Sequence, residues 1–303
     1  MKLSEKQLVL LSVALSAAVI AVAVAALALR RPAPLPAAGT GYVALIRIDG
    51  AIAYQTSQLS LLGSTASADD LVQLLDTALN DPLAKAVVLR VNSPGGSAAA
   101  SEALYLKVKE LAASKPVVAY IEEYGTSGAY MAVLPAARIL ASNSSIVGSV
   151  GVYTSVITYS GLLEKLGVKV YVFKSGELKD VGSSFREPSE EDRKVLQSIV
   201  DGVFELFKKR VLAHRKVADE GEVFSGRPFI AGEAVKLGLI DGIGTLDDAV
   251  NLAREMAGLP KDTPVREMKP PSPGLLQLLF GGAAAKDRFV PSVEVLAMWP
   301  PPG

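Results

Sequence analysis

Short apolar runs alternate with stretches of helical periodicity along most of the chain. Runs bounded by turn residues predict strands over 42–48, 86–91, 117–121, 138–141, 145–152 and 168–173. Apolar residues spaced three and four apart predict helices over 69–80, 101–113, 129–137, 162–166, 189–216, 231–237 and 246–256. Because strands and helices alternate, the pattern predicts an α/β fold with a largely parallel sheet.

The helix predicted over 189–216 is the longest of the set. Ser189 and Asp192 have the spacing of a capping box, and acidic residues fill the first turn, where they suit the helix dipole. An apolar stripe runs along one face of this helix and comprises Val195, Ile199, Val203, Phe207 and Val211. The stripe predicts that this face packs against other apolar surface.

The two ends of the chain differ in composition from the middle. Residues 8–29 carry no charge, and at ~1.5 Å per residue their 22 positions span a ~30 Å hydrocarbon core. A cleaved signal peptide is the alternative, since 37–38 imitates a cleavage site, but its apolar region should be only about 7–15 residues. We therefore predict an uncleaved anchor and Pro/Ala linker over 1–41, a catalytic domain over 42–260 and a Pro-rich tail over 261–303. Flanking charges do not fix the orientation of the anchor.

Composition excludes several classes of function. Lys+Arg and Asp+Glu are equal at 31 each, so no basic surplus points to nucleic acid. The absence of cysteine excludes disulfides, thiolate metal sites and cysteine nucleophiles. The single histidine, His214, lies in a basic stretch late in the long helix, which is a poor place for a catalytic base. Serine chemistry in this chain would therefore have to use a lysine.

A small-residue turn, Gly125-Thr126-Ser127-Gly128-Ala129, joins an apolar strand to the helix predicted over 129–137. Ser127 is either a helix N-cap or a nucleophile held where a strand turns into a helix. In the second case the N–H of Gly128 could stabilise an oxyanion together with N–H groups of the turn over 92–96. That turn, Asn-Ser-Pro-Gly-Gly, could equally be an ordinary strand-to-helix loop.

Two further segments contain residues suited to serine chemistry. Lys179, in the charged stretch 174–180, can serve as a general base if burial favours its neutral amine; otherwise it is an ordinary solvated lysine. Ser149, in Gly-Ser-Val-Gly-Val over 148–152, can fix a lysine amine through a hydrogen bond or merely satisfy a turn.

These segments together resemble the signal peptide peptidase A family, peptidase family S49. The resemblance runs from about 42 to 257 and includes VNSPGG, YGTSGAY, GSVGV, KSGELKD, FREPSEEDRKVLQ and FSGRPFIAGEAVKLGLIDGIG. It implies Ser127 as nucleophile, Lys179 as general base and Ser149 as the residue that orients the lysine amine. It places Gly96 and Gly128 at the oxyanion-hole positions, with Gly95 as the alternative to Gly96.

The resemblance also carries expectations beyond the site. It implies a ClpP/crotonase-type fold of stacked ββα units, a homo-oligomer, and a cell-membrane location with one N-terminal helix in the lipid and the catalytic domain outside the cytoplasm. The expected substrates are cleaved signal peptides and other hydrophobic peptides, and neither a cofactor nor a metal is expected. The chain resembles the short, single-unit form, although Ala129 replaces a glycine that often follows Ser-Gly in the family. A crotonase-type coenzyme A thioester enzyme and a non-catalytic membrane scaffold are the alternatives.

Overall fold

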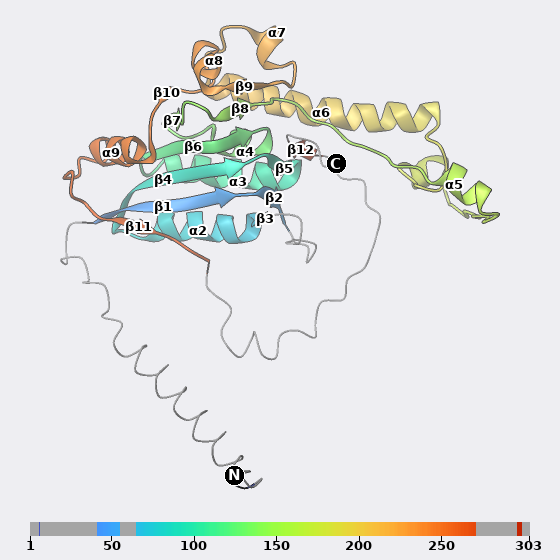
Figure 1. Ribbon diagram of the computed structural model, residues 1–303, viewed down its shortest axis with the longest axis horizontal. Coiled ribbons are helices and arrows are strands. Elements are labelled where there is room, and N and C mark those ends of the chain that lie inside the picture. Colours follow the sequence, from blue (N-terminus) through green and yellow to red (C-terminus); the bar gives the residue numbers. More distant parts are fainter. Residues whose placement is uncertain (1–5, 7–40, 55–64, 271–295, 299–303) are drawn as a thin grey trace, which may run out of the picture. The chain divides into compact units, whose positions relative to one another are not determined.

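The computed structural model describes residues 6, 41–54, 65–270 and 296–298 (Figure 1). The predicted anchor over 8–29 and most of the predicted linker and tail lie outside the described residues. No helix within the described ranges is long and apolar enough to cross a membrane.

The main sheet has the strand order β10-β7-β6-β4-β1-β11, with every neighbouring pair parallel (Figure 1). Strand β8 pairs with the end of β6 and is joined by antiparallel β9. The structure thus confirms the α/β class with a largely parallel sheet. Strand β11 falls within the segment predicted as a tail. The bounds are β1 Tyr42–Asp49, β4 Ala84–Ser93, β6 Val117–Thr126, β7 Arg138–Ala141, β8 Ile146–Gly148, β9 Pro228–Ile230, β10 Gly242–Ile243 and β11 Val265–Glu267.

A second, smaller sheet lies beyond the ends of β1 and β4, whose chains lead directly into two of its strands. Its order is β12-β5-β2-β3, with β2 parallel to β3 and β5, and β12 antiparallel to β5. The bounds are β2 Ala51–Ala53, β3 Thr65–Ser67, β5 Gly95–Ser97 and β12 Leu296–Met298.

The side chains of the central strands alternate between two apolar layers, as the two-residue period of a strand requires. On β4, Val87, Leu89 and Val91 join the larger core, which contains the buried faces of α2, α3 and α4. Ala86 and Val88 of the same strand pack in the second layer, under α9. The helices are α2 Ala68–Asn80, α3 Ala98–Ala112, α4 Gly128–Val133, α5 Ser160–Lys165, α6 Glu190–His214, α7 Glu220–Val223, α8 Ala231–Lys236 and α9 Leu246–Met256.

Residues 160–206, here called the arm, comprise α5, the 3₁₀ turn η2 (Glu177–Asp180) and the first part of α6. Figure 1 shows the arm reaching beyond the sheet. Asp192 is its only buried residue, and neither α5 nor η2 has any. Of the apolar stripe predicted on α6, only Phe207 and Val211 are buried, and both lie past the arm. Ile199 remains 43% exposed.

Two sequence predictions need correction. The segment 168–173, predicted as a strand, is irregular. It lies on the arm, no strand of the described residues pairs with it, and a strand forms only as part of a ladder. The helix predicted over 129–137 ends at Val133, where the chain turns to enter β7. The capping box of Ser189 and Asp192 is confirmed.

Candidate active site

Two serines with strained backbones lie side by side at the carboxyl ends of β6 and β8. Ser127 has φ 54° and Ser149 has φ 51°, and within the described ranges no other residue except glycine has a positive φ. Thr126 pairs with Gly148 in parallel strands, so each serine is the next residue along its strand. The Ser127 N–H donates to the carbonyl oxygen of Gly148 at 2.6 Å. Such strain concentrates at functional sites, where the surrounding structure maintains it.

The hydroxyl of Ser127 does not serve as a helix cap. Its residue precedes α4, but its side chain makes no capping hydrogen bond, so the N-cap interpretation loses its physical basis. The main chain instead holds the residue, with its carbonyl accepting from the Met131 N–H at 2.9 Å. Ser127 is only 1% exposed, among the small buried residues of α4. The sequence prediction of a strand-to-helix turn at Ser127 is confirmed.

Ser149 is fixed by both its side chain and its main chain. Its Oγ donates to the carbonyl oxygen of Gly226 at 3.0 Å, and its N–H donates to that of Arg227 at 3.1 Å. Because the hydroxyl proton is committed to Gly226, the oxygen keeps its lone pairs for a donor such as an amine.

Strand β5 brings a glycine turn against α4, the helix that begins directly after Ser127. A Cβ on Gly96 would lie 2.0 Å from the carbonyl oxygen of Ile52, so only glycine fits there. The N–H of Gly95 is already committed, since it donates to Ser93 Oγ at 3.2 Å. This hydrogen bond makes the Gly95 N–H less suited to bind an oxyanion.

The edge of β5 opposite β2 is occupied by an extended segment of chain. Strand β12 pairs with it in antiparallel orientation, with Ala297 opposite Gly96, and also lies against α4. A peptide bound in this manner would place its backbone beside both the glycine turn and the Ser127 junction. Strand addition of this kind is a general mode of peptide recognition.

Lys179 lies apart from the two serines in the single chain. It belongs to η2 on the arm, its side chain is exposed, and its N–H donates to the Gly176 carbonyl at 3.1 Å. Within the described ranges, no hydrogen bond joins Lys179 to Ser127 or Ser149. The structure thus brings together the predicted nucleophile, the predicted orienting serine and the glycine turn, but not the predicted base.

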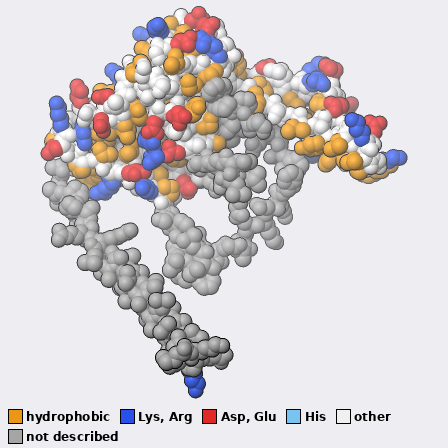
Figure 2. Space-filling view, viewed as in Figure 1, with side chains coloured by type: hydrophobic (Ala, Val, Ile, Leu, Met, Phe, Trp, Pro, Cys, Tyr) orange, Lys and Arg blue, Asp and Glu red, His pale blue; other side chains and the backbone are white. Residues whose placement is uncertain are grey.

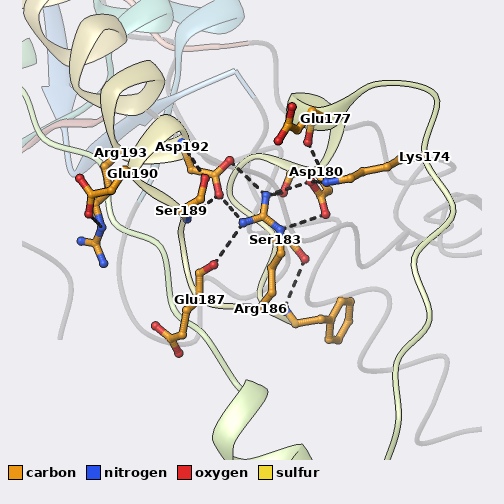
Figure 3. Close-up of polar contacts among 11 residues, drawn as sticks. Lys174, Glu177, Asp180, Ser183, Arg186, Glu187, Ser189, Glu190, Asp192 and Arg193 are labelled. Atoms are coloured by element: carbon orange, nitrogen blue, oxygen red, sulfur yellow. Dashed lines mark hydrogen bonds and ion pairs between the residues drawn. The ribbon is translucent and has the colours of Figure 1, made fainter.

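A polar cluster beside Lys179 was not expected from the sequence (Figure 3). Arg186 lies between Asp180 and Asp192 and hydrogen-bonds to both carboxylates, while Lys174 donates to Asp180 from another direction at 2.8 Å. Hydrogen bonds from Arg186 and Lys174 hold the pKa of Asp180 well below its usual range. Those from Arg186 and the Ser189 N–H lower the pKa of Asp192 to about 2. The motif FREPSEEDRKVLQ contains Arg186, but nothing in it shows which acids it contacts.

His214 lies away from the two serines, on α6 beside α3, in agreement with the sequence prediction that it is not the catalytic base. Its Nε2 lies 3.0 Å from the hydroxyl of Tyr105 on α3. Burial, reinforced by neighbouring Arg215, Lys109 and Arg210, lowers the pKa of His214 and favours its neutral form. Within the described ranges no group of acidic or histidine side chains could hold a metal ion.

Comparison with known proteins identifies the family. The profile of peptidase family S49 matches residues 109–260, half of the chain. A candidate protease of Methanocaldococcus jannaschii is 42% identical over 62% of this chain and 61% of its own length. The chloroplastic serine protease SPPA of Arabidopsis thaliana is 30% identical over 80% of this chain but only 37% of its own length. Among solved structures, the 1510-N membrane-bound stomatin-specific protease aligns with 77% of this chain and 94% of its own, at 14% identity and TM-score 0.43.

The chain therefore spans less than two thirds of the length of these two curated relatives. The matched region contains Ser127, Ser149 and Lys179 and continues through α9. The chain belongs to the signal peptide peptidase A family of serine peptidases, peptidase family S49.

Proposed function

We propose that the protein is a serine endopeptidase in which Ser127 is the nucleophile and Lys179 the general base. One observation carries the proposal: the strained pair of Ser127 and Ser149 on adjacent parallel strands. A strained serine whose hydroxyl caps nothing is suited to attack, and a second one with free lone pairs is suited to orient an amine. For the fold we propose the ClpP/crotonase type of stacked ββα units, which the family resemblance implies and with which the largely parallel sheet is compatible.

In the proposed reaction, neutral Lys179 takes the proton of Ser127 as its Oγ attacks a peptide carbonyl. Ser149 Oγ accepts a hydrogen bond from the lysine amine and fixes its direction. The N–H groups of Gly96 and Gly128 donate to the oxyanion that forms. Lys179 gives the proton to the leaving amine, and an acyl-enzyme results. A water molecule then attacks the acyl carbon as it gives a proton to Lys179, and Lys179 passes this proton to Ser127 Oγ as the ester bond breaks and the acid is released.

The proposed substrates are hydrophobic peptides associated with the cell membrane, including cleaved signal peptides. An extended peptide that took the place of β12 would pair with β5 in the same way. The residues that follow Ser127 on α4 are apolar and uncharged, which favours small or medium apolar side chains at the cleavage point. An N-terminal membrane helix, with the catalytic domain outside the cytoplasm, would keep the site near such substrates.

A fluorophosphonate probe followed by peptide mass spectrometry tests the nucleophile directly. We expect a covalent adduct on Ser127, turnover of apolar peptides by the wild type, and none by Ser127→Ala. Lys179→Arg should also be inactive, since arginine stays protonated. Absence of the adduct would favour a crotonase-type thioester enzyme, and unchanged peptide turnover in Ser127→Ala would favour a scaffold. Faster cleavage after Lys or Asp than after Ala or Leu would contradict the proposed pocket.

We further propose that Ser127 and Lys179 of one active site come from different subunits of a homo-oligomer. The arm carries Lys179 and has almost no core of its own, whereas apolar side chains gather on its surface (Figure 2). Phe173 is 95% exposed, and on the α6 stripe Ile199 is exposed while Val195 and Val203 are half-buried. Exposed apolar patches are rarely left in contact with water, so we propose that a second copy of the chain packs against this surface.

Mixed oligomers test the shared site. Ser127→Ala and Lys179→Ala subunits, each inactive alone, are combined by co-expression, and mixing is confirmed by native mass spectrometry. A shared site should recover roughly a quarter of the wild-type activity, because one of four pairings at each interface is complete. Mixed oligomers without activity would reject the shared site and leave the dyad itself intact.

A further inference from the structure

The guanidinium of Arg186 joins two parts of the arm that are otherwise separate in the chain. Its Nε and Nη2 donate to the two carboxylate oxygens of Asp180, at 3.0 Å and 2.9 Å. The same group donates to both oxygens of Asp192, through Nη1 and, at 3.1 Å, through Nη2. Paired contacts of this geometry are the strongest that arginine forms with carboxylates. Figure 3 shows the guanidinium between the two acids.

Each acid is tied to a defined main-chain position. Asp180 is the last residue of η2 and directly follows Lys179. Asp192 closes the capping box of α6, where its carboxylate accepts from the Ser189 N–H at 2.9 Å. Arg186 thereby connects the turn that carries Lys179 to the first turn of the long helix.

Packing cannot hold the turn in place, because the turn has no buried residue. Its internal support is main-chain hydrogen bonding, from the Lys179 N–H to Gly176 and from the Val181 N–H to Leu178, together with Lys174 Nζ, which donates to the Glu177 carbonyl oxygen at 2.7 Å and to the Asp180 carboxylate at 2.8 Å. A four-residue 3₁₀ turn with two such bonds is weak by itself. The side-chain contacts of Arg186 are therefore what holds the turn against α6.

Arg186 also occupies the carboxylate of Asp180, the residue next to Lys179. The Asp180 carboxylate is the nearest acid in sequence, and a free carboxylate beside an amine favours the protonated form. Here both of its oxygens accept from Arg186, and Lys174 adds a contact at 2.8 Å. Within the described ranges, Lys179 forms no ion pair.

We propose that Arg186 is a positioning residue for Lys179, which fixes the 177–180 turn to the start of α6 and keeps the Asp180 carboxylate occupied. The proposal rests on the proposed role of Lys179 as general base. A base displaced by about 1 Å costs roughly 100-fold in rate. Loss of the clamp should therefore lower the rate of the chemical step more than substrate binding.

The test compares Arg186→Ala and Arg186→Lys with Arg193→Gln in the full chain. Arg193 lies on the first turn of α6, is exposed and pairs only weakly with Glu190 at 3.8 Å, so its loss is the matched control. We expect kcat to fall roughly 10- to 100-fold in both Arg186 variants, with KM changed less than about twofold. Arg186→Lys should not rescue, because an ammonium lacks the planar fork with which the guanidinium contacts both oxygens of each carboxylate. Added methylguanidinium should restore part of kcat in Arg186→Ala but not in Lys179→Ala.

Hydrogen exchange of the 175–183 segment separates this inference from the proposed function. We expect faster exchange at the amides of Lys179 and Val181 in Arg186→Ala, and wild-type exchange in Arg193→Gln. Unchanged exchange, or faster exchange with wild-type kcat, would overturn the positioning role. If the wild type neither turns over peptides nor labels at Ser127, the proposed function fails, and the exchange comparison decides by itself whether Arg186 holds the turn. Asp192→Asn, which keeps the shape of the cap, should reproduce the exchange result.

Discussion

Replacing Gly96 with alanine tests whether the glycine turn belongs to the active site. The added Cβ would lie 2.0 Å from the Ile52 carbonyl oxygen and 2.6 Å from its nitrogen. Contacts below 3.0 Å are essentially never observed for a real Cβ, so β5 must move about 1 Å away from β2. Both clashing atoms are main chain, and no side-chain rotation can relieve the contact.

The magnitude follows from that displacement. Overpacking of this kind costs about 1–3 kcal/mol of stability, which lowers Tm by roughly 2–4 °C per kcal/mol in a domain of this size. The effect on catalysis should be larger. Moving an oxyanion donor by about 1 Å, or losing it, lowers kcat/KM by roughly 100- to 1,000-fold. Gly96→Ala should therefore be a folded protein with almost no activity.

The assay is peptide turnover measured beside thermal unfolding, with Gly232→Ala as the control. Gly232 lies on α8, and a Cβ added there would meet nothing within 4 Å, so alanine should raise stability by about 0.5–1 kcal/mol and leave turnover unchanged. Wild-type kcat/KM in Gly96→Ala would refute the placement of this backbone in the oxyanion hole. A variant that is unfolded at the assay temperature would refute the estimate of the clash.

Three further predictions concern pH and assembly. The value of kcat/KM should rise with pH in both the wild type and His214→Ala, because a neutral amine rather than imidazole takes the proton; loss of the rising limb in His214→Ala would contradict this. Ile199→Ser should shift the oligomer towards smaller species in light scattering and reduce turnover, whereas Ser198→Ala on the same helix should not; an unchanged mass would argue against the uncovered stripe as an interface. Arg186 lowers the pKa of Asp192 to about 2. The Asp192 carboxylate therefore stabilises the folded arm fully above the ordinary carboxyl pKa near ~4, and this contribution is lost as pH falls from there through about 2. Exchange at the start of α6 should rise over that range in the wild type and not in Asp192→Asn; equal acid profiles would contradict the clamp.

Much of the fold could be predicted because its signals are local. The capping box at Ser189 specifies where α6 begins, and the apolar runs of the parallel strands are long enough to mark their positions. The segment 168–173 has the same apolar character but forms no strand, because a ladder needs a neighbour and no strand in the described part of the chain pairs with it. The amino-acid composition of a segment indicates its tendency to form a strand, whereas the neighbouring strand that it needs is supplied only by the folded structure.

The candidate site likewise has some features that the sequence shows and others that only tertiary pairing produces. Ser127 and Ser149 could be found from their small-residue turns, and the structure adds that both have positive φ on paired strands. Pairing of Thr126 with Gly148, which brings them together, depends on sheet register that no single segment encodes. Arg186 was missed for a related reason. Arg186, Asp180 and Asp192 lie in a short segment that contains many other charged residues. Only the geometry of their contacts distinguishes a clamp from a set of solvated side chains.

The contrast between the two halves of the proposed dyad has a physical consequence. Ser127 lies in a rigid environment, 1% exposed and held by strands on both sides, whereas Lys179 lies on an arm whose only buried residue is Asp192. A base must be placed to within about 1 Å, and a coreless arm cannot supply that accuracy by packing. Two sources of order remain, the Arg186 clamp within the arm and the cover that a neighbouring subunit would provide for its apolar surface. If both are required, a lone subunit holds its nucleophile ready but lacks a placed base, so peptide cleavage would begin only when subunits assemble.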